Sequence, residues 1–287
     1  MTARRGLTFA LVVTVFVAVL EFWGGYASRS LALTGDAVHV TMDVFALGLA
    51  LLAAAGAERP ADRKRTYGYG RIEVLGAMLN GTLLLVATIV IVYAAVRRFG
   101  APVEPEAALM SGVAAIGLIC NGVVGYALHA SQRDLNVRAA LFHVLGDALG
   151  AIAVIAGGVA IALTHRAWID PALSLFVAAI IVTGVLRVMR DATAVLLESV
   201  PPGLDDAELT EHIREIGGVT SVHDLHVWSI GSGSHALSAH VLLDDRRLSE
   251  ANAVLREIDD CLRQHFGIAH VTIQFECESC PVIVDHR

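Results

Sequence analysis

Six long apolar stretches alternate with short polar segments over the first 190 residues. Each stretch is long enough to cross the ~30 Å hydrocarbon core of a bilayer, which takes about 20 helical residues. Composition agrees, because the mean hydropathy is +0.64 and only 17% of the residues are charged, against about 25% in a typical soluble protein. The pattern predicts a multi-pass α-helical membrane protein with six transmembrane helices, near residues 7–27, 33–56, 74–96, 107–130, 139–164 and 170–188.

The pattern changes after residue 190, where charged residues become frequent and the apolar stretches become short. Two prolines and a glycine between residues 198 and 203 indicate a linker. We therefore expect a transmembrane domain at 1–190, a linker at 191–203 and a small α+β domain with a three-stranded sheet at 204–287. Apolar periodicity predicts its helices at 205–217 and 248–266 and its strands at 219–230, 235–243 and 271–275.

Lysine and arginine are distributed unequally between the two sides of the predicted bundle. Eleven lie in segments that would face one side and four in segments that would face the other. Because positive loops remain in the cytoplasm, the N-terminus is predicted to be cytoplasmic, and six spans return the C-terminus to the same side. Arg97 and Arg98 fall on the opposite side, where long side chains can snorkel at a helix end. The net charge is −7, and no broad basic surface indicates a nucleic-acid partner.

Two His-x-x-x-Asp repeats lie inside predicted spans, one at His39 and Asp43 and the other at His143 and Asp147. Residues four apart share one face of a helix and lie about 6 Å apart along its axis. Two such helices facing each other would supply two imidazoles and two carboxylates, a set that suits tetrahedral Zn²⁺. A charged side chain in the membrane costs from ~2.5 kcal/mol upward and usually marks a pathway or a site. A single polar residue could instead form a hydrogen bond between helices.

Other polar residues leave alternatives open. Asp36 lies one turn before His39 and could be a third ligand of the site, a charge near the helix N-terminus or a hydrogen-bond anchor. Cys277 and Cys280 form a C-x-x-C pair. In a reducing cytosol such a pair binds metal more often than it forms a disulfide.

Taken together, these motifs resemble the cation diffusion facilitator family, in its zinc-transporter branch. The resemblance implies a homodimer in the lipid bilayer, with a six-helix membrane domain and a ferredoxin-like cytosolic domain that dimerises. It also implies exchange of metal for protons at a transport site formed by His39, Asp43, His143 and Asp147. The matching segments are Ser30–Asp43, Tyr67–Gly76, His143–Asp147, His223–Ser229 and His270–Glu276.

The resemblance also implies metal binding in the C-terminal domain, although the match there is looser. Some bacterial members have His and Asp on the last strand, where this chain has Gln274 and Glu276. Eight of the 12 histidines follow residue 210, which supports metal binding over ordinary surface histidines. The candidate ligands of this domain are His223, His226, His240, His270, Glu276, Cys277 and Cys280.

We therefore expect an antiporter that exports Zn²⁺, and in addition Cd²⁺, Fe²⁺ or Co²⁺, with protons as the counter-ion. Zn²⁺ would also bind the C-terminal domain and regulate transport. The compact, alanine- and valine-rich chain suggests the inner membrane of a bacterium. An intramembrane metalloenzyme and a metal sensor that does not transport are the alternatives, but the sequence contains no H-E-x-x-H motif, and we do not expect an enzyme.

Overall fold

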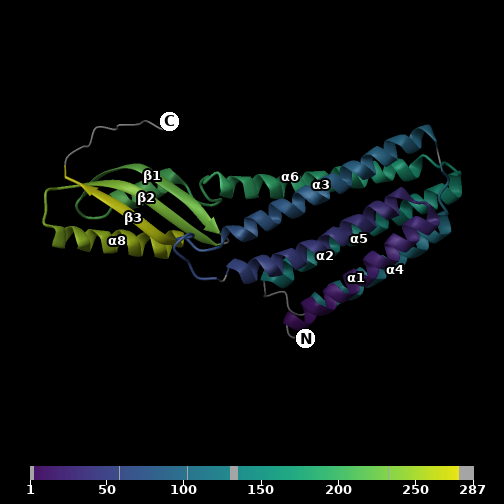
Figure 1. The fold of residues 1–287 in the computed structure, drawn as a ribbon, viewed down its shortest axis with the longest axis horizontal. Coiled ribbons are helices and arrows are strands. Elements are labelled where there is room, and N and C mark those ends of the chain that lie inside the picture. Colours follow the sequence, from purple (N-terminus) through teal and green to yellow (C-terminus); the bar gives the residue numbers. More distant parts are fainter. Residues whose placement is uncertain (1–2, 58, 102, 130–134, 232, 278–287) are drawn as a thin grey trace. The chain divides into compact units, whose positions relative to one another are not determined.

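The computed structural model describes residues 3–57, 59–101, 103–129, 135–231 and 233–277. Within these ranges, the side chains of residues 3–7, 47, 50, 51, 53–55, 57, 128, 129 and 135–143 are not described. Six long helices precede two short helices and three strands (Figure 1). The long helices are α1 (Ala3–Ser28), α2 (Leu31–Ala57), α3 (Arg71–Gly100), α4 (Ala107–His129), α5 (Leu135–Thr164) and α6 (Ile169–Leu196).

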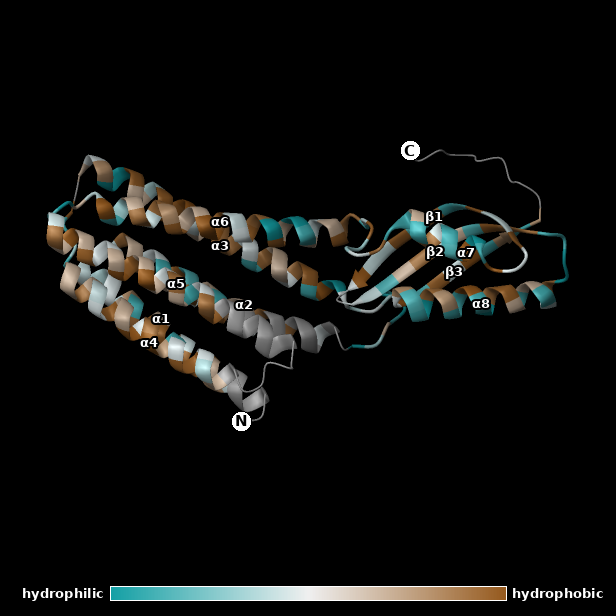
Figure 2. Cartoon of the chain, turned by 180° about the vertical axis from the view of Figure 1, so that it is seen from behind, coloured by the Kyte–Doolittle hydropathy of each residue, from teal (hydrophilic) through white to brown (hydrophobic). Residues whose placement is uncertain are grey.

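The long helices have the composition of membrane spans. Within the described residues, five of these helices are long and apolar enough to cross a membrane. Helix α2 is the sixth long helix. Brown, apolar residues are frequent along the long helices in Figure 2, and large apolar side chains such as Phe16 and Leu163 are exposed. A helix that is apolar all round suits lipid and does not suit water. Six helices at the six predicted stretches therefore agree with the sequence analysis.

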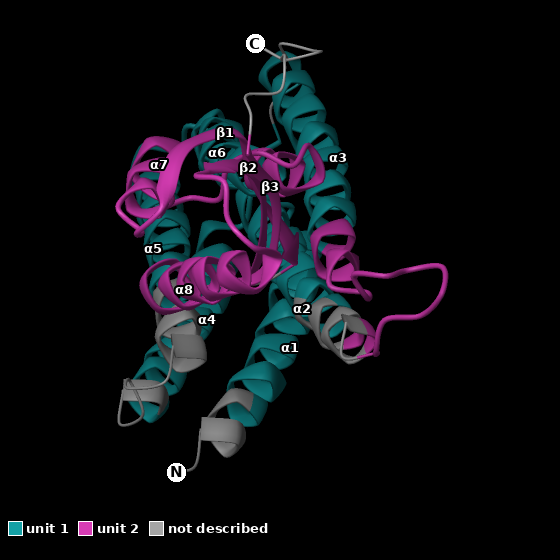
Figure 3. Cartoon of the chain, turned by 90° about the vertical axis from the view of Figure 1, so that its left-hand side faces the viewer, with its two compact units in different colours: residues 1–51, 77–189 teal, residues 52–76, 190–287 magenta. Residues whose placement is uncertain are grey.

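The chain forms two compact units, and the first contains residues 1–51 and 77–189 (Figure 3). In this unit α1, α4 and α5 pack closely, because small residues lie where the helices meet. A Cβ at Gly158 of α5 would overlap the hydroxyl of Ser111 of α4. An apolar cluster around Leu84, Ile181 and Val185 joins α3 to α6.

One buried acid anchors the start of α2. Asp170, in the first turn of α6, is fully buried. Its carboxylate accepts hydrogen bonds from the Ser30 hydroxyl at 2.6 Å and from the backbone N–H of Leu31 at 2.8 Å. The Ser30 hydroxyl in turn accepts a hydrogen bond from the N–H of Leu33 at 3.1 Å. These bonds satisfy N–H groups that every helix leaves without partners at its N-terminus.

Asp170 also explains the position of Arg98, one of the two arginines on the side of the bundle where few positive residues are expected. Arg98, near the end of α3, donates to Asp170 Oδ2 at 3.0 Å and to the carbonyl of Arg29 at 2.7 Å. Its side chain is only 16% exposed. Arg98 therefore does not snorkel as expected but neutralises a buried carboxylate, and the start of α2, the end of α3 and the start of α6 are held together.

The second unit contains residues 52–76 and 190–287. Its sheet has the order β1-β2-β3, with β1 antiparallel to β2 and β2 parallel to β3. Two helices cover one face of this sheet, and their apolar side chains meet those of Leu237 and Val241 from β2. Because side chains alternate between the faces of a strand, His240 lies on the other face. The elements are α7 (Asp206–Arg214), β1 (Val219–Gly231), β2 (Ser234–Leu243), α8 (Leu248–Phe266) and β3 (Ile268–Glu276).

The last strand begins three residues earlier than predicted. Helix α8 ends at Phe266 and is capped by Gly267, which has φ 66° in the left-handed region that glycine adopts readily. Ile268 follows it immediately and is fully buried as the first residue of β3. The order helix–strand–strand–helix–strand agrees with the prediction.

The segment before α3 packs on the sheet within the second unit. Gly70 and Gly231 meet backbone to backbone, since a Cβ at Gly231 would lie 2.9 Å from the Cα of Gly70. Arg71, the first residue of α3, donates to Glu198 at 2.8 Å. Glycine is needed at position 231, because the backbone of Gly70 already fills the space that a Cβ would occupy.

Candidate metal sites

Three of the four predicted transport ligands have described side chains, and these three lie together. His39 and Asp43 are one turn apart on α2, with 3.6 Å between His39 Nε2 and Asp43 Oδ2. Asp147 of α5 joins them, and one ligand atom from each of the three lies within 4.8 Å of the other two. We call His39, Asp43 and Asp147 the membrane group. A tetrahedral Zn²⁺ with bonds of 2.0–2.2 Å places its ligand atoms about 3.4 Å apart. A small movement of the three side chains towards one another would therefore allow all three to bind one ion.

The fourth predicted ligand, His143, lies on α5 four residues before Asp147. Its side chain is outside the described part of the chain, so its place in the site remains a prediction. Helical geometry puts residues 143 and 147 on the same face of α5. Asp147, on that face of α5, belongs to the membrane group.

Asp36 lies beside the membrane group but is not a member of it. Its side chain is buried, and its Oδ1 would be 3.3 Å from a Cβ at Gly150 of α5. Its carboxylate interacts electrostatically with both Asp147 and Asp43. Of the three roles left open for Asp36, this placement favours support of the site over ligation.

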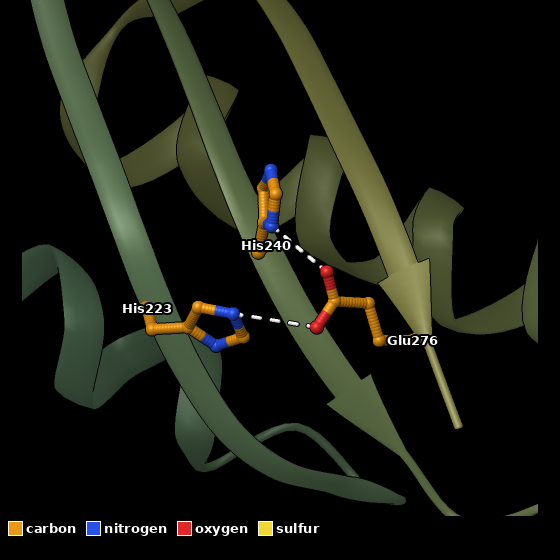
Figure 4. A group of neighbouring side chains, drawn as sticks. All are labelled: His223, His240 and Glu276. Carbon is orange, nitrogen blue, oxygen red and sulfur yellow. Dashed lines mark ion pairs between the residues drawn. The ribbon is translucent and has the colours of Figure 1, made fainter. Parts of the chain in front are cut away.

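A second group forms on the open face of the sheet. Strand register pairs His223 of β1 with His240 of β2, and their ring centroids are 5.3 Å apart. Glu276, the last residue of β3, points between them (Figure 4). Its Oε1 lies 2.8 Å from His240 Nδ1 and its Oε2 lies 3.3 Å from His223 Nε2. We call His223, His240 and Glu276 the tail group; its ligand atoms also lie within 4.8 Å of one another.

The environment of Glu276 keeps its carboxyl group ionised. Burial alone would raise the pKa of Glu276, but a hydrogen bond from Gln274 at 3.1 Å and the neighbouring His223 and His240 outweigh burial. The pKa of Glu276 therefore lies below its ordinary value. An ionised carboxylate beside two imidazole nitrogens is a donor set that suits Zn²⁺. Gln274, on the same strand, holds one oxygen of this carboxylate in place through that hydrogen bond.

Asp224 lies beside the tail group and was not among the residues predicted from the sequence. A bulge between His223 and His226 interrupts the register of β1, and Asp224 has φ 50° there. Its carboxylate oxygens lie 3.1 Å from His226 Nε2 and 3.8 Å from His240 Nε2. Asp224 thus lies on the side of the His240 ring away from Glu276, where carboxylates that support metal ligands are found, although 3.8 Å is an ion-pair distance and not a hydrogen bond. The apolar residues Val222 and Leu225 are three apart instead of two, and this break in the strand alternation was the signal for the bulge in the sequence.

The remaining tail candidates lie apart from the tail group. His226 contacts Asp224 and is not within the group. His270 is in register with Ala236, four residues from Gln274 along β3, which corresponds to about 13 Å. It packs edge-on against Tyr67 with ring centroids 5.2 Å apart and lines an open cavity of about 480 Å³. Cys277 is exposed, and Cys280 lies outside the described residues.

Comparisons with known proteins cover nearly the whole chain. Residues 7–197 match the cation efflux transmembrane domain, and residues 201–278 match the cytoplasmic domain of cation efflux proteins. The metal cation efflux system protein CzcD of Cupriavidus metallidurans is 40% identical over 278 residues, which are 96% of this chain and 88% of that protein.

Two further relatives have a similar extent. The cadmium, cobalt and zinc/H(+)-K(+) antiporter of Bacillus subtilis is 35% identical over 96% of this chain and 90% of its own length. The zinc transporter ZitB of Escherichia coli is 38% identical over 97% of this chain and 88% of its own length. A solved structure of the metal-bound C-terminal domain of the Cupriavidus CzcD transporter is 44% identical, with a TM-score of 0.24, and covers 25% of this chain and 99% of that one.

Proposed function

Because the chain belongs to the cation efflux family, also called the cation diffusion facilitators, we propose that it exports Zn²⁺ from the cytosol in exchange for protons. Membership makes the protein a metal cation efflux transporter of the membrane and places it among transporters, not enzymes. The identity of the ion and the proton coupling are the parts that we propose. Cd²⁺, Co²⁺ and Fe²⁺ are the further candidate substrates.

The membrane group is the observation that carries this proposal. It brings one imidazole and two carboxylates together between α2 and α5, and His143 would complete the set of two nitrogens and two oxygens. Such a set suits Zn²⁺, whereas Mn²⁺ favours more oxygen ligands. An acid buried in a membrane helix is otherwise so unfavourable that it usually marks a transport pathway.

Competition between Zn²⁺ and protons for the same atoms provides the coupling. Zn²⁺ binds neutral imidazole and ionised carboxylate, so its affinity falls when these groups bind protons. With the site open to the cytosol, Zn²⁺ binds and protons leave. With the site open to the other side, protons return to Asp43, Asp147 or a histidine and Zn²⁺ is released. A membrane potential of 100 mV adds ~2.3 kcal/mol for each net charge moved.

We further propose that both termini are cytoplasmic in the inner membrane, as the distribution of lysine and arginine predicts. The division at 1–190, 191–203 and 204–287 remains our proposal for the domains. The protein would act as a homodimer through its cytoplasmic domain. Zn²⁺ held by His223, His240 and Glu276 would favour the transport-competent dimer, with His226, His270, Cys277 and Cys280 as candidates for additional sites.

The test is metal flux in proteoliposomes that contain a pH-sensitive dye, with Zn²⁺, Cd²⁺, Fe²⁺ and Mn²⁺ compared. We expect zinc entry to drive proton counterflow in the wild-type protein and neither to occur in Asp43→Ala. Zinc flux without proton movement would contradict the coupling. Tight zinc binding without any flux would contradict transport and favour a metal sensor.

A further inference from the structure

Glu21 is a buried acid that the proposed metal site does not use. It lies on α1, is 2% exposed, and is not a member of the membrane group. Within the described part of the chain, its Oε2 has no hydrogen-bond partner. A buried ionised carboxylate without a partner is strongly unfavourable, so the protein must gain something from keeping this acid.

Groups from three neighbouring helices face Glu21. On α4, a Cβ at Gly117 would lie only 2.7 Å from Glu21 Oε1, so the carboxyl group lies directly against the backbone of that helix. Cys120 of α4 also interacts electrostatically with Glu21. The carboxyl groups of Asp36 on α2 and Asp147 on α5 are close enough to act on Glu21 electrostatically. Glu21 is therefore electrostatically connected to the membrane group through Asp147.

Glu21, Asp36 and Asp147 are all buried, and they cannot all be ionised unless a cation compensates them. The membrane group can be neutralised by Zn²⁺, because its ligand atoms converge on one place. The Glu21 carboxylate is not among these ligand atoms. A proton is therefore the cation that can neutralise it. Zn²⁺ bound by the membrane group compensates the charge of Asp147, and this change of charge is the means by which zinc binding can displace a proton from Glu21.

On the basis of the zinc-for-proton exchange proposed above, we propose that Glu21 is a proton-binding site of the transporter, outside the metal ligands. Its carboxylate binds one proton when Zn²⁺ leaves the membrane group and releases that proton when Zn²⁺ binds. The exchanged protons are then not all carried by the metal ligands themselves.

Proton release by the purified full-length protein tests this role. Zinc chloride is added to the protein in weakly buffered detergent solution with a pH indicator dye, and zinc binding is measured in parallel. We expect Glu21→Gln to bind zinc but to release about one proton fewer per zinc bound at the transport site, since the amide cannot titrate. Any zinc bound by the tail contributes equally to both proteins and cancels in the difference.

Matched variants make the result specific. Glu104→Gln changes an exposed glutamate that pairs with His165 and should release as many protons as wild type. Glu21→Asp keeps a carboxyl group and should restore part or all of the lost proton. An unchanged proton count in Glu21→Gln, in a wild-type protein that does exchange zinc for protons, overturns the role of Glu21 and leaves the exchange intact. A wild-type protein that transports zinc without protons overturns both.

A second measurement needs no variant. Infrared difference spectra of the wild-type protein, recorded before and after zinc addition, report protonated carboxylic acids through their C=O stretching band. We expect zinc to remove such a band, and isotope-labelled glutamate to shift it. The absence of any zinc-sensitive glutamic acid band overturns the proposal even if Glu21→Gln fails to fold.

Discussion

The membrane group and the tail group have similar ligands but are assembled in different ways. His39 and Asp43 come from one turn of α2, and only Asp147 has to be brought to them by helix packing. In the tail group, each of the three ligands comes from a different strand, so the group depends on the register of the whole sheet. The first site is therefore largely local in sequence, whereas the second exists only after the domain has folded.

The largest expected effect is the loss of zinc flux when the membrane group loses a ligand, and it distinguishes this group from the tail group within one protein. Asp147→Ala removes a ligand of the membrane group and should abolish zinc flux in proteoliposomes, while zinc binding by the tail is unchanged. Glu276→Ala should weaken zinc binding by the tail and lower zinc flux without abolishing it, because zinc in the tail group favours the transport-competent dimer but is not the transported ion. Asp191→Ala, which changes an exposed aspartate on α6, is the control for both. Normal flux in Asp147→Ala would contradict the assignment of the transport site.

A smaller effect is expected from Asp170→Asn, which touches neither group. The change removes the charge that compensates Arg98 and weakens the bonds at the start of α2. Breaking a buried pair on one side costs about 3 kcal/mol, so the thermal unfolding temperature of the membrane unit should fall. Asp191→Asn should leave it unchanged. Because α2 carries His39 and Asp43, zinc affinity of the membrane group should also fall, while the tail group retains its affinity.

Asp224→Asn should affect the tail group alone and more weakly. Supporting carboxylates of metal ligands contribute about 10- to 100-fold in affinity. Because Asp224 lies 3.8 Å from His240, we expect the lower end of this range in zinc titrations of the full-length protein. Asp244→Asn, in the exposed segment after β2, is the matched control. An affinity equal to wild type would show that the bulge in β1 does not orient the ligands.

The smallest expected effect is the pH dependence that Glu276 gives to the metal-free tail. Folding lowers the pKa of Glu276 below its ordinary value of 4.5. The stabilisation is therefore complete above that value and is lost as the pH falls through the lower folded value. Hydrogen exchange of β3 should differ between wild type and Glu276→Gln at neutral pH, and the difference should vanish in acid. A difference that grows in acid would contradict the lowered pKa.

The contrast between the groups also explains what could be predicted from the sequence. The six helices, the fold class and the family were confirmed, because apolar length and local motifs carry them. The pairing of His39 with Asp43 follows from helical periodicity alone. The role of Arg98 was predicted wrongly because its partner, Asp170, is 72 residues away in the sequence.

The ligands on the sheet were harder to predict, again because their partners are distant in the sequence. His223, His240 and Glu276 were identified as candidates, but nothing local distinguishes them from His270, which the register carries to another part of β3. Asp224 was missed because its orientation depends on a backbone bulge, and such a bulge is a property of the paired strands.

The anchored start of α2 limits how the metal ligands can move. If Ser30 stays fixed to Asp170, α2 can only swing about that end, like a rod on a pivot. Asp43 lies 13 residues from Ser30, or about 20 Å along the helix axis. A swing of roughly 6° would then displace Asp43 by about 2 Å, ten times the tolerance of about 0.2 Å within which a metal holds its ligands. A rotation of only a few degrees about the anchored end would therefore be sufficient to release the ion.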